Sequence, residues 1–507
     1  MNHYDVVIVG AGSAGCALAA RLSEDRSRTV LLLEAGDELH APFDATNDLL
    51  DAARMVGAAH GHPANWAFQA RLSAWRETTV RRGKVMGGSS TINGGSFVRA
   101  TRADFDAWAA AGNDEWSYDT VLPFLKRMEH DHDFADREVH GSDGPIPVSR
   151  TAHSALHPVS SAFLRACADQ GFAHEVDKNA PGEPGWGVLP CNVVDGVRVN
   201  TALAYIQPNF ARPNLTVTCR TTARRVLFDG TRAIAVEVEQ AGELVVISGE
   251  EIVLCAGAVM SAHTLLLSGI GPAAALAANG VTVVADLAGV GTRCQDHPQL
   301  LLGFAMADAM RLPTGAAVAE VALDTTVDGA PVSLMPYLSP MSALIPNAAA
   351  SASNLCLGIV LERSSTPVEI SLASGDPDIP PLINYHYLQT STDRDRLRAA
   401  AEIGLTLIDS AAMGGAGAAR TSPPVGVYLD DWIAATIGTA VHLCSSAPMG
   451  PDTDVMAVVD QYCRVRGVEG LRVVDTSVLP TTPSRGTAAT AVLIGERASA
   501  FFGGAAL

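Results

Sequence analysis

Residues 4–37 read YDVVIVGAGSAGCALAARLSEDRSRTVLLLEAGD. Residues 5–9 form a short apolar run that is typical of a buried strand. Residues 13–22 carry the small and apolar side chains of a buried helix, and residues 29–33 predict a second strand. The segment therefore predicts a strand, a tight turn, a helix and a second strand.

Three glycines occupy the predicted turn with the spacing G-x-G-x-x-G, at Gly10, Gly12 and Gly15. Gly10 permits the tight turn, Gly12 lets the backbone approach a pyrophosphate, and Gly15 allows the helix to pack closely on the strand. The phosphates would lie at the positive N-terminal end of the helix, beside Ser13 and Ala14.

An acidic residue follows the second predicted strand. Glu34 stands 34 − 15 = 19 residues after Gly15, where a carboxylate can accept hydrogen bonds from a ribose diol, with Ala35 beside it. The acid favours an unphosphorylated adenosine ribose, and hence FAD or NAD over NADP. A glycine-rich turn alone also occurs in unrelated α/β proteins, but the four features together favour a dinucleotide. They do not separate FAD from NAD.

The bulk composition limits the class of protein. A chain of 507 residues is long enough for two or more domains. Its composition, 48% hydrophobic and 18% charged residues, is that of a globular protein. The formal net charge of −19 argues against nucleic acid or anionic lipid as a main partner, because both need a basic surface.

The cysteines and the N-terminus indicate the compartment. The nine cysteines include no C-x-x-C pair, which fits reduced thiols in a cytoplasm. The first predicted strand starts at residue 4 or 5 and leaves no room for a signal peptide, and no uncharged apolar run is long enough to cross a bilayer. We therefore expect a cytoplasmic protein, with peripheral docking at the inner face of the membrane left open. No metal site and no oligomeric state are predicted.

A second glycine-rich segment follows at residues 82–99, RGKVMGGSSTINGGSFVR. It is too rich in Gly, Ser and Asn for a regular element, but such a backbone can wrap closely around a flat ligand. The preceding residues 38–80 predict loops and short helices.

Several segments resemble the glucose–methanol–choline (GMC) flavin oxidoreductases. RGKVMGGSSTIN (82–93) is similar to the first signature of that family, and EEIVLCAGAVMSAHTLLLSGIGP (250–272) is similar to the second. Further segments match in the same order at residues 214–228, 287–298, 368–400 and 468–484. The resemblance covers nearly the whole chain and implies that the dinucleotide is FAD.

The resemblance also implies which residues meet the cofactor. Besides the first turn, Glu34 and Ala35, the implied positions are Met86, Gly87, Ser90, Asn93, Gly94, Gly95, Ala223, Ala256, Gly257, Asp475, Thr487 and Ala488. Relatives that bind flavin covalently have a His immediately before the Asn of the first signature. This chain has Ile92 before Asn93, so we expect non-covalent FAD.

The segment VHLCSSAPMG (441–450) resembles the family pattern H-x-x-G-T-C-x-M-G and implies that His442 is catalytic. An alcohol hydroxyl is a very weak acid, and an imidazole with a reference pKa of about 6.5 can accept its proton as hydride leaves the carbon. A buried core histidine is the alternative. His263 and His297 are less favoured, because they lie in segments that the family uses for adenosine binding and packing.

The chain departs from the family near its C-terminus. Relatives carry a second His or Asn in a segment like P-S-G-N-T, whereas residues 483–487 read PSRGT and place Gly486 at that position. The neighbouring Arg485 could supply a fixed positive charge to the substrate oxygen, or it could be a surface arginine paired with a carboxylate. The loss of the second group argues against ordinary small-alcohol oxidation.

This altered tail, with INGGSFVRA (92–100) and HGSDGPIPV (140–148), looks most like the GMC enzyme that accompanies the peptide-derived redox cofactor mycofactocin. The implied substrate is the reduced cofactor, mycofactocinol, and the implied electron acceptor is the respiratory chain. A small-alcohol or choline-type dehydrogenase or oxidase, an FAD-containing lyase and a catalytically silent FAD-binding partner stay open. A dehydrogenase is favoured over an oxidase.

We therefore expect an α/β protein with two domains. The resemblance implies a discontinuous Rossmann-like FAD-binding domain at residues 1–150, 195–300 and 435–507. A smaller antiparallel-sheet domain at residues 151–194 and 301–434 would bind the substrate.

Overall fold

The strand, turn, helix and second strand predicted at the N-terminus are present. In the computed structural model, which describes residues 3–306, 316–339 and 354–503, they are β1 (His3–Val9), α1 (Ser13–Leu22) and β2 (Val30–Leu33). The two strands pair in parallel, and all four residues of β2 are buried. A parallel pair joined by a helix is the unit that the sequence predicts.

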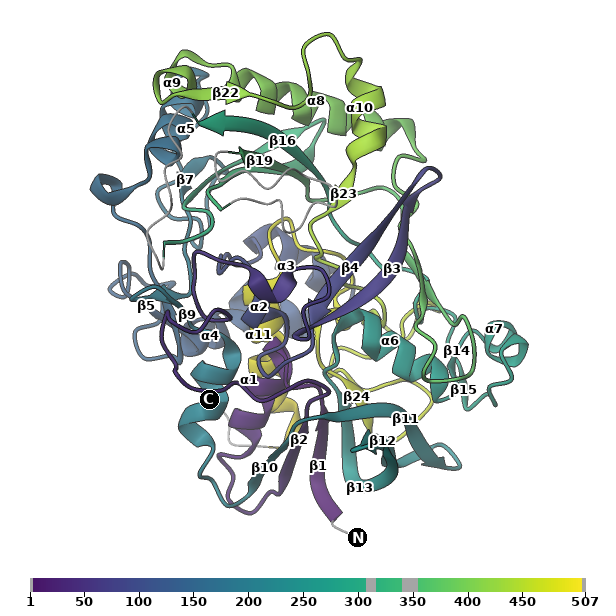
Figure 1. The fold of residues 1–507 in the computed structure, drawn as a ribbon. Helices are drawn as coiled ribbons and strands as arrows, with labels where there is room; N and C mark the ends of the chain where they lie inside the picture. Colours follow the sequence, from purple (N-terminus) through teal and green to yellow (C-terminus); the bar gives the residue numbers. More distant parts are fainter. Residues whose placement is uncertain (1–2, 307–315, 340–353, 504–507) are drawn as a thin grey trace.

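This unit is the centre of a seven-stranded sheet with the order β10-β2-β1-β13-β12-β11, in which β24 also pairs with β13. Only β12 runs antiparallel to β1, because both of its pairings, with β13 and with β11, are antiparallel, whereas the other pairings of this sheet are parallel. The remaining strands of this sheet are β10 (Leu215–Thr218), β11 (Thr221–Asp229), β12 (Arg232–Gln240), β13 (Glu243–Leu254) and β24 (Leu471–Val473). Segments more than 450 residues apart in the chain thus share one sheet with α1 against it (Figure 1).

A second sheet lies at the opposite end of the molecule and is antiparallel, with the order β22-β16-β19-β18-β17-β7 and β23 beside β16 (Figure 1). Its strands are β7 (Trp186–Val188), β16 (Pro298–Met306), β17 (Val321–Val327), β18 (Ala330–Tyr337), β19 (Asn354–Leu361), β22 (Ala418–Arg420) and β23 (Gly438–Thr439). Helix α8 (Ser391–Ile408) contacts β16 and β19, and α5 (Pro158–Asp169) and α10 (Leu429–Thr436) contact α8. These helices cover the outer face of the sheet.

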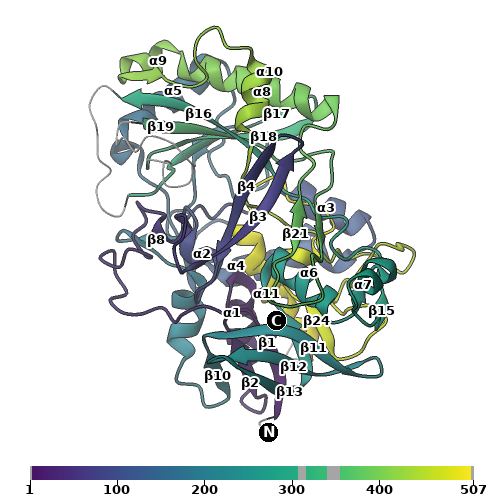
Figure 2. The ribbon, with the colours of Figure 1, turned by 45° about the vertical axis from the view of Figure 1, so that its right-hand side comes forward.

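The prediction of loops and short helices at residues 38–80 is wrong for the second half of that segment. It contains a hairpin of β3 (Asn65–Ser73) and β4 (Arg76–Gly83), which runs between the two ends of the molecule (Figure 2). β3 pairs with β21 (Leu382–Asn384), and β21 pairs with β20 (Glu369–Ser371). Because these partners come about 300 residues later, local sequence carries little signal for the hairpin.

The remaining helices and short strands connect these sheets. They are α2 (Ser89–Ile92), α3 (Arg102–Ala110), α4 (Tyr118–Met128), α6 (Gly257–Leu267), α7 (Ala273–Ala278), α9 (Ala411–Gly415), α11 (Ala488–Ala498), β5 (Glu129–Asp131), β6 (Ile146–Val148), β8 (Val193–Val194), β9 (Val197–Arg198), β14 (Ile270–Gly271) and β15 (Ala285–Asp286). α11 packs against α1, where Gly495 leaves room for the backbone of Ala14. The C-terminal helix therefore lies behind the first glycine-rich turn.

One hydrophobic core runs through both sheets. The predicted fold class, a Rossmann-like α/β domain with an antiparallel-sheet domain, is confirmed, whereas its residue boundaries stay a prediction. Residues 307–315 and 340–353, which the prediction assigns to the substrate domain, lie outside the described residues. In the described part of the chain, no helix combines the length and the hydropathy needed to cross a bilayer.

Candidate active site

A cavity of about 680 Å³ extends from the first glycine-rich turn to the second sheet. Its lining comes from the turn between β1 and α1, the 82–98 segment, the start of α6, the inner face of the second sheet and the C-terminal tail. Segments that are far apart in the sequence therefore enclose one ligand-sized space.

The N-terminus of α1 opens onto this cavity. Its N-cap residue is Gly12, no side chain caps the helix, and Ser13 and Ala14 line the cavity. A Cβ atom at Gly88 would collide with Gly12, so the two glycine-rich segments touch through their backbones. The uncapped N–H groups and the positive end of the helix fit a pyrophosphate.

Glu34 lies at the carboxyl end of β2 and lines the same end of the cavity. Its carboxylate accepts hydrogen bonds from the backbone N–H groups of Ala11 at 3.0 Å and Gly36 at 2.9 Å. Burial raises the pKa of Glu34 to about 7, although both hydrogen bonds oppose the shift. The two bonds fix the acid where an adenosine ribose would lie.

Most of the residues predicted to bind FAD line the cavity. They are Gly10, Gly12, Ser13, Ala14, Glu34, Ala35, Ser90, Asn93, Gly94, Ala223, Ala256, Gly257, Asp475, Thr487 and Ala488. The structure thus brings together positions from seven separate stretches of the chain.

Four of the predicted cofactor residues are not part of the lining: Gly15, Met86, Gly87 and Gly95. Gly15 faces the carbonyl of Gly10, where a Cβ atom would collide, and the N–H of Gly87 donates to the carbonyl of Ala11 at 2.7 Å. These two glycines shape the turns that carry the lining residues.

Asp475 connects the C-terminal tail to the start of α6. Its carboxylate accepts hydrogen bonds from the N–H of Gly257 at 2.8 Å, the hydroxyl of Ser261 at 2.6 Å and the N–H of Ser477 at 2.8 Å. Protein donors therefore occupy both of its oxygens, and Asp475 braces the cavity wall.

His442 lies at the junction of the two sheets, just after β23, and lines the cavity. Its backbone N–H donates to Asp296 at 2.8 Å, which fixes the chain on which the ring stands. Burial lowers the pKa of His442 well below its ordinary value, and the positive charges of His297 and Arg82 lower it further. A neutral imidazole with access to the cavity can act as a proton acceptor.

The Nε2 side of the His442 ring faces the turn at residues 483–487. A Cβ atom at Gly486 would lie 3.7 Å from Cε1 and 3.8 Å from Nε2 of His442. Among the residues that the structure describes, Nε2 has no hydrogen-bond partner, unlike Nδ1. The glycine therefore leaves open space beside the nitrogen that would meet a substrate.

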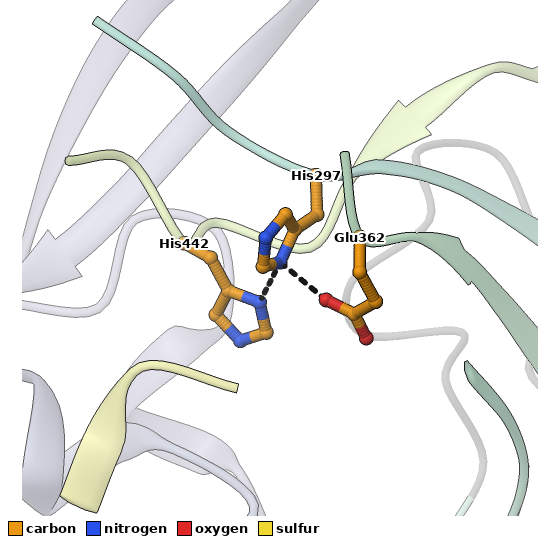
Figure 3. A group of neighbouring side chains, drawn as sticks. All are labelled: His297, Glu362 and His442. Carbon is orange, nitrogen blue, oxygen red and sulfur yellow. Dashed lines mark hydrogen bonds and ion pairs between the residues drawn. The ribbon is translucent and has the colours of Figure 1, made fainter. Parts of the chain in front are cut away.

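His297, which the sequence assigns to a packing segment, lies directly against His442. The two Nδ1 atoms are 2.9 Å apart, Nε2 of His297 donates to the carbonyl of Pro483 at 3.1 Å, and Nδ1 of His297 is 2.8 Å from Oε2 of Glu362 (Figure 3). Burial opposes charge on His297, but Glu362 and Asp296 raise its pKa above the ordinary value.

Arg485 is buried, with 7% of its surface exposed, and it lines the cavity. It forms ion pairs with Glu175 at 2.9 Å and Asp324 at 3.0 Å. Lys178 contacts the same two carboxylates at 2.7 and 2.8 Å. The alternative of a surface arginine is therefore wrong, whereas pairing with carboxylates is what the structure shows.

Sequence reasoning missed the wall of the cavity formed by the second sheet. Its polar members include Gln299, Tyr337 and Glu362, and its apolar members include Leu301, Met335 and Val360. In β16, residues 299, 301 and 303 are less buried than their neighbours, a period of two that marks one face of a strand. This alternation is visible in the burial of the strand and not in its sequence, because residues 300–302 are all leucine, so the sequence carried no signal for Leu301. Glu362 follows the strand β19 and had none.

A dinucleotide turn and a neutral imidazole on one cavity define a class of protein, the dinucleotide-dependent oxidoreductases. Comparison with known proteins identifies the family. The chain matches GMC oxidoreductases over residues 4–299 and 365–495, which is more than half of its length. The chain belongs to the GMC oxidoreductase family and is an FAD-dependent enzyme.

Individual relatives cover nearly the whole chain. A GMC-type oxidoreductase of Rhodococcus erythropolis, encoded in the thcA 5′ region and uncharacterized, is 41% identical over 98% of both chains. Oxygen-dependent choline dehydrogenase of Vibrio vulnificus is 32% identical over 98% of this chain and 94% of its own.

Solved structures share the fold. Pyridoxine 4-oxidase from Mesorhizobium loti superimposes with a TM-score of 0.91 at 30% identity, over 98% of this chain and 99% of its own. Formate oxidase from Aspergillus oryzae superimposes with a TM-score of 0.89 at 22% identity, over 99% of this chain and 98% of its own, and this likeness supports the fold alone.

Proposed function

We propose that the protein oxidises an alcohol CH–OH group, with His442 as the base that accepts the hydroxyl proton. The observation that carries this proposal is that the neutral His442 ring and the α1 N-terminus share one cavity. Bound FAD would supply the two-electron acceptor for the hydride. The relatives named for choline and pyridoxine support a CH–OH donor.

The residues around His442 divide the work between them. Asp296 fixes the backbone of His442, and the open space at Gly486 admits the alcohol oxygen beside Nε2. Because the charge of Arg485 is already balanced by Glu175 and Asp324, backbone N–H groups of the 484–487 turn are the better candidates for holding that oxygen. The lining positions named above would hold FAD, without a covalent bond at Ile92.

For the substrate we propose mycofactocinol, with electrons passed to the respiratory chain from the cytoplasm, where the enzyme would be free or docked at the inner face of the membrane. The support is the altered tail and the 92–100 segment, of which Ser96 and Val98 line the cavity. The 140–148 segment contributes less, since His140 is buried in ion pairs with Glu129 and Asp177. Choline, pyridoxine and small alcohols are the competing donors.

Replacing His442 tests the proposed reaction. We expect His442→Ala to keep its FAD and to lower the rate of anaerobic flavin reduction by about 10²-fold or more, because general base catalysis is lost. The measurement is the loss of flavin absorbance after mixing with reduced mycofactocin, choline, pyridoxine or a small alcohol. A variant that reduces its flavin at the wild-type rate contradicts the role of His442. Substrate turnover without any bleaching of the flavin would indicate a lyase instead.

A further inference from the structure

We propose that His442, His297 and Glu362 form a proton relay, in which the proton taken from the alcohol comes to rest on His297 beside the Glu362 carboxylate. This inference rests on the proposed function and deepens it. His297 and Glu362 are positioning residues in this scheme, because only His442 meets the substrate.

The three side chains come from three separate places in the fold (Figure 3). His297 directly precedes β16, Glu362 directly follows β19, and His442 follows β23. Because β16 pairs with both β19 and β23, the second sheet holds the three groups in one register. Strand pairing therefore sets the distances in the relay.

The contacts of His297 show which neighbour can exchange a proton with it. The approach of the two Nδ1 atoms has hydrogen-bond geometry, at 2.9 Å, whereas Glu362 lies at ion-pair distance, 2.8 Å, without the direction of a hydrogen bond. Nε2 of His297 already donates to Pro483. His297 therefore exchanges its Nδ1 proton with His442, and Glu362 acts on it through charge.

The charges around the pair favour His297 as the place where the proton rests. Glu362 and Asp296 stabilise a positive His297, while His297 and Arg82 both disfavour a positive His442. The other titratable or charged groups near this cluster are Tyr385, which donates to Asp296, Cys444, and Arg485, which lies on the Glu362 side. The two rings titrate as a pair, and Glu362 raises the pKa of that pair.

The step balances as two proton transfers and one hydride transfer. Nε2 of His442 bonds to the hydroxyl proton, the Nδ1–H bond of His442 breaks, and an N–H bond forms at Nδ1 of His297. Bound FAD would accept the C–H electron pair as hydride, and the alcohol would become a carbonyl. Only the neutral His442–His297 pair can accept the hydroxyl proton. The rate of flavin reduction therefore rises as pH increases through the pKa of the pair.

Glu362→Gln removes the charge while keeping the shape. An opposite charge at this distance shifts a pKa by about 1–3 units. We therefore expect the acid limb, the part of the pH–rate profile where flavin reduction speeds up with rising pH, to move about one pH unit lower. The maximal rate should fall by about 10-fold, because the pair becomes a weaker proton acceptor. Glu362→Asp keeps the charge and should show a smaller shift of the acid limb and a smaller fall in the maximal rate. The measurement is the anaerobic reduction rate from pH 5 to 9.

Glu320→Gln is the matched control. Glu320 is a buried carboxylate of the same domain that accepts hydrogen bonds from Ser160 and from the backbone of His157, and it is not part of the cavity lining. Loss of the Glu320 charge should leave the acid limb of the pH–rate profile at its wild-type pH. An equal shift in this variant would overturn the relay.

Thermal denaturation gives a second readout that does not depend on turnover. His297 has a raised pKa in the folded state, so its contribution to stability is present below the unfolded value of about 6.5 and is lost as pH rises through the folded value. The Tm difference between wild type and Glu362→Gln should therefore change over that interval. A difference that is constant with pH contradicts the coupling.

Three results would overturn the relay but leave the proposed function standing, provided that His442→Ala reduces its flavin slowly. One is an unchanged acid limb in Glu362→Gln. Another is a raised KM for cationic alcohols alone, which would make Glu362 a substrate-binding group. The third is a metal ion bound by His297, Glu362 and His442, detected as a loss of wild-type rate after treatment with EDTA and its recovery with Zn²⁺. If His442→Ala and Glu362→Gln both reduced their flavin at the wild-type rate, the proposed function would be rejected as well.

Discussion

His442 and Glu362 show what a sequence does and does not indicate about single residues. His442 stands in a local pattern, so ten residues suffice to single it out. Glu362 follows an apolar strand in a segment without any motif, and its importance depends on a contact with His297, which lies 362 − 297 = 65 residues earlier. Chemistry that arises from a non-local contact leaves no pattern in the local sequence.

Arg485 allows a prediction about stability. Arg485→Met leaves Glu175 and Asp324 buried with Lys178 as their remaining partner, so one negative charge is uncompensated. We expect a loss of about 3–5 kcal/mol in the free energy of unfolding at pH 7, measured by chemical denaturation. Arg485→Lys keeps the charge and should lose less.

The pH dependence of this loss follows from Asp324. Burial would raise the pKa of Asp324, but Arg485 and Lys178 lower it to about 2. A depressed carboxyl pKa contributes stability above the unfolded value of about 3.9, and this contribution is lost as pH falls toward the folded value. The difference between wild type and Arg485→Met should thus shrink below about pH 4. A variant with wild-type stability but slow flavin reduction would instead assign Arg485 to the substrate.

At the level of elements, the first turn was predictable and the β3–β4 hairpin was not. The turn is specified by glycines within six residues of one another, each needed for a local reason. The hairpin is held by distant partners: β3 pairs with β21, and Arg76 donates to the carbonyls of Ile437 at 2.5 Å and Ala435 at 2.7 Å. Tertiary contacts of this kind override weak local preference.

The packing of α1 on this turn gives a prediction. A Cβ atom at Gly15 would collide with the carbonyl oxygen of Gly10 and press on Cys255, so Gly15→Ala must push α1 away from the turn. We expect FAD affinity to fall by about 10-fold or more, because overpacking costs about 1–3 kcal/mol and displaces the phosphate-binding N–H groups. Flavin content after dialysis is the measurement.

Gly182→Ala is the control for this substitution, since Gly182 is exposed and a Cβ atom there meets no atom within 4 Å. It should keep the wild-type flavin content. Equal FAD affinity in wild type and Gly15→Ala would show that α1 does not position the cofactor.

For the whole molecule, the order of the motifs predicted the fold class, because each motif marks a segment that must return to the same cofactor. The sequence could not show how the second sheet closes over that site. That closure depends on pairings between β16, β19 and β23, in which paired residues lie up to 439 − 298 = 141 residues apart and are set by packing. The boundaries between the domains depend on the same pairings.

This architecture predicts how FAD affects stability. The cavity is lined both by the N-terminal turn and by residues of the second sheet and the C-terminal tail, and one core runs through both sheets. FAD at 100 times its Kd should therefore stabilise the folded protein by about 2.7 kcal/mol and raise the Tm of one cooperative unfolding transition. His442→Ala should show the same rise, because its base is lost but its cofactor contacts remain, whereas Gly15→Ala should show a smaller one. Two separate calorimetric transitions, of which only one responds to FAD, would mean that the two sheets unfold independently and that the cofactor is held by the first alone.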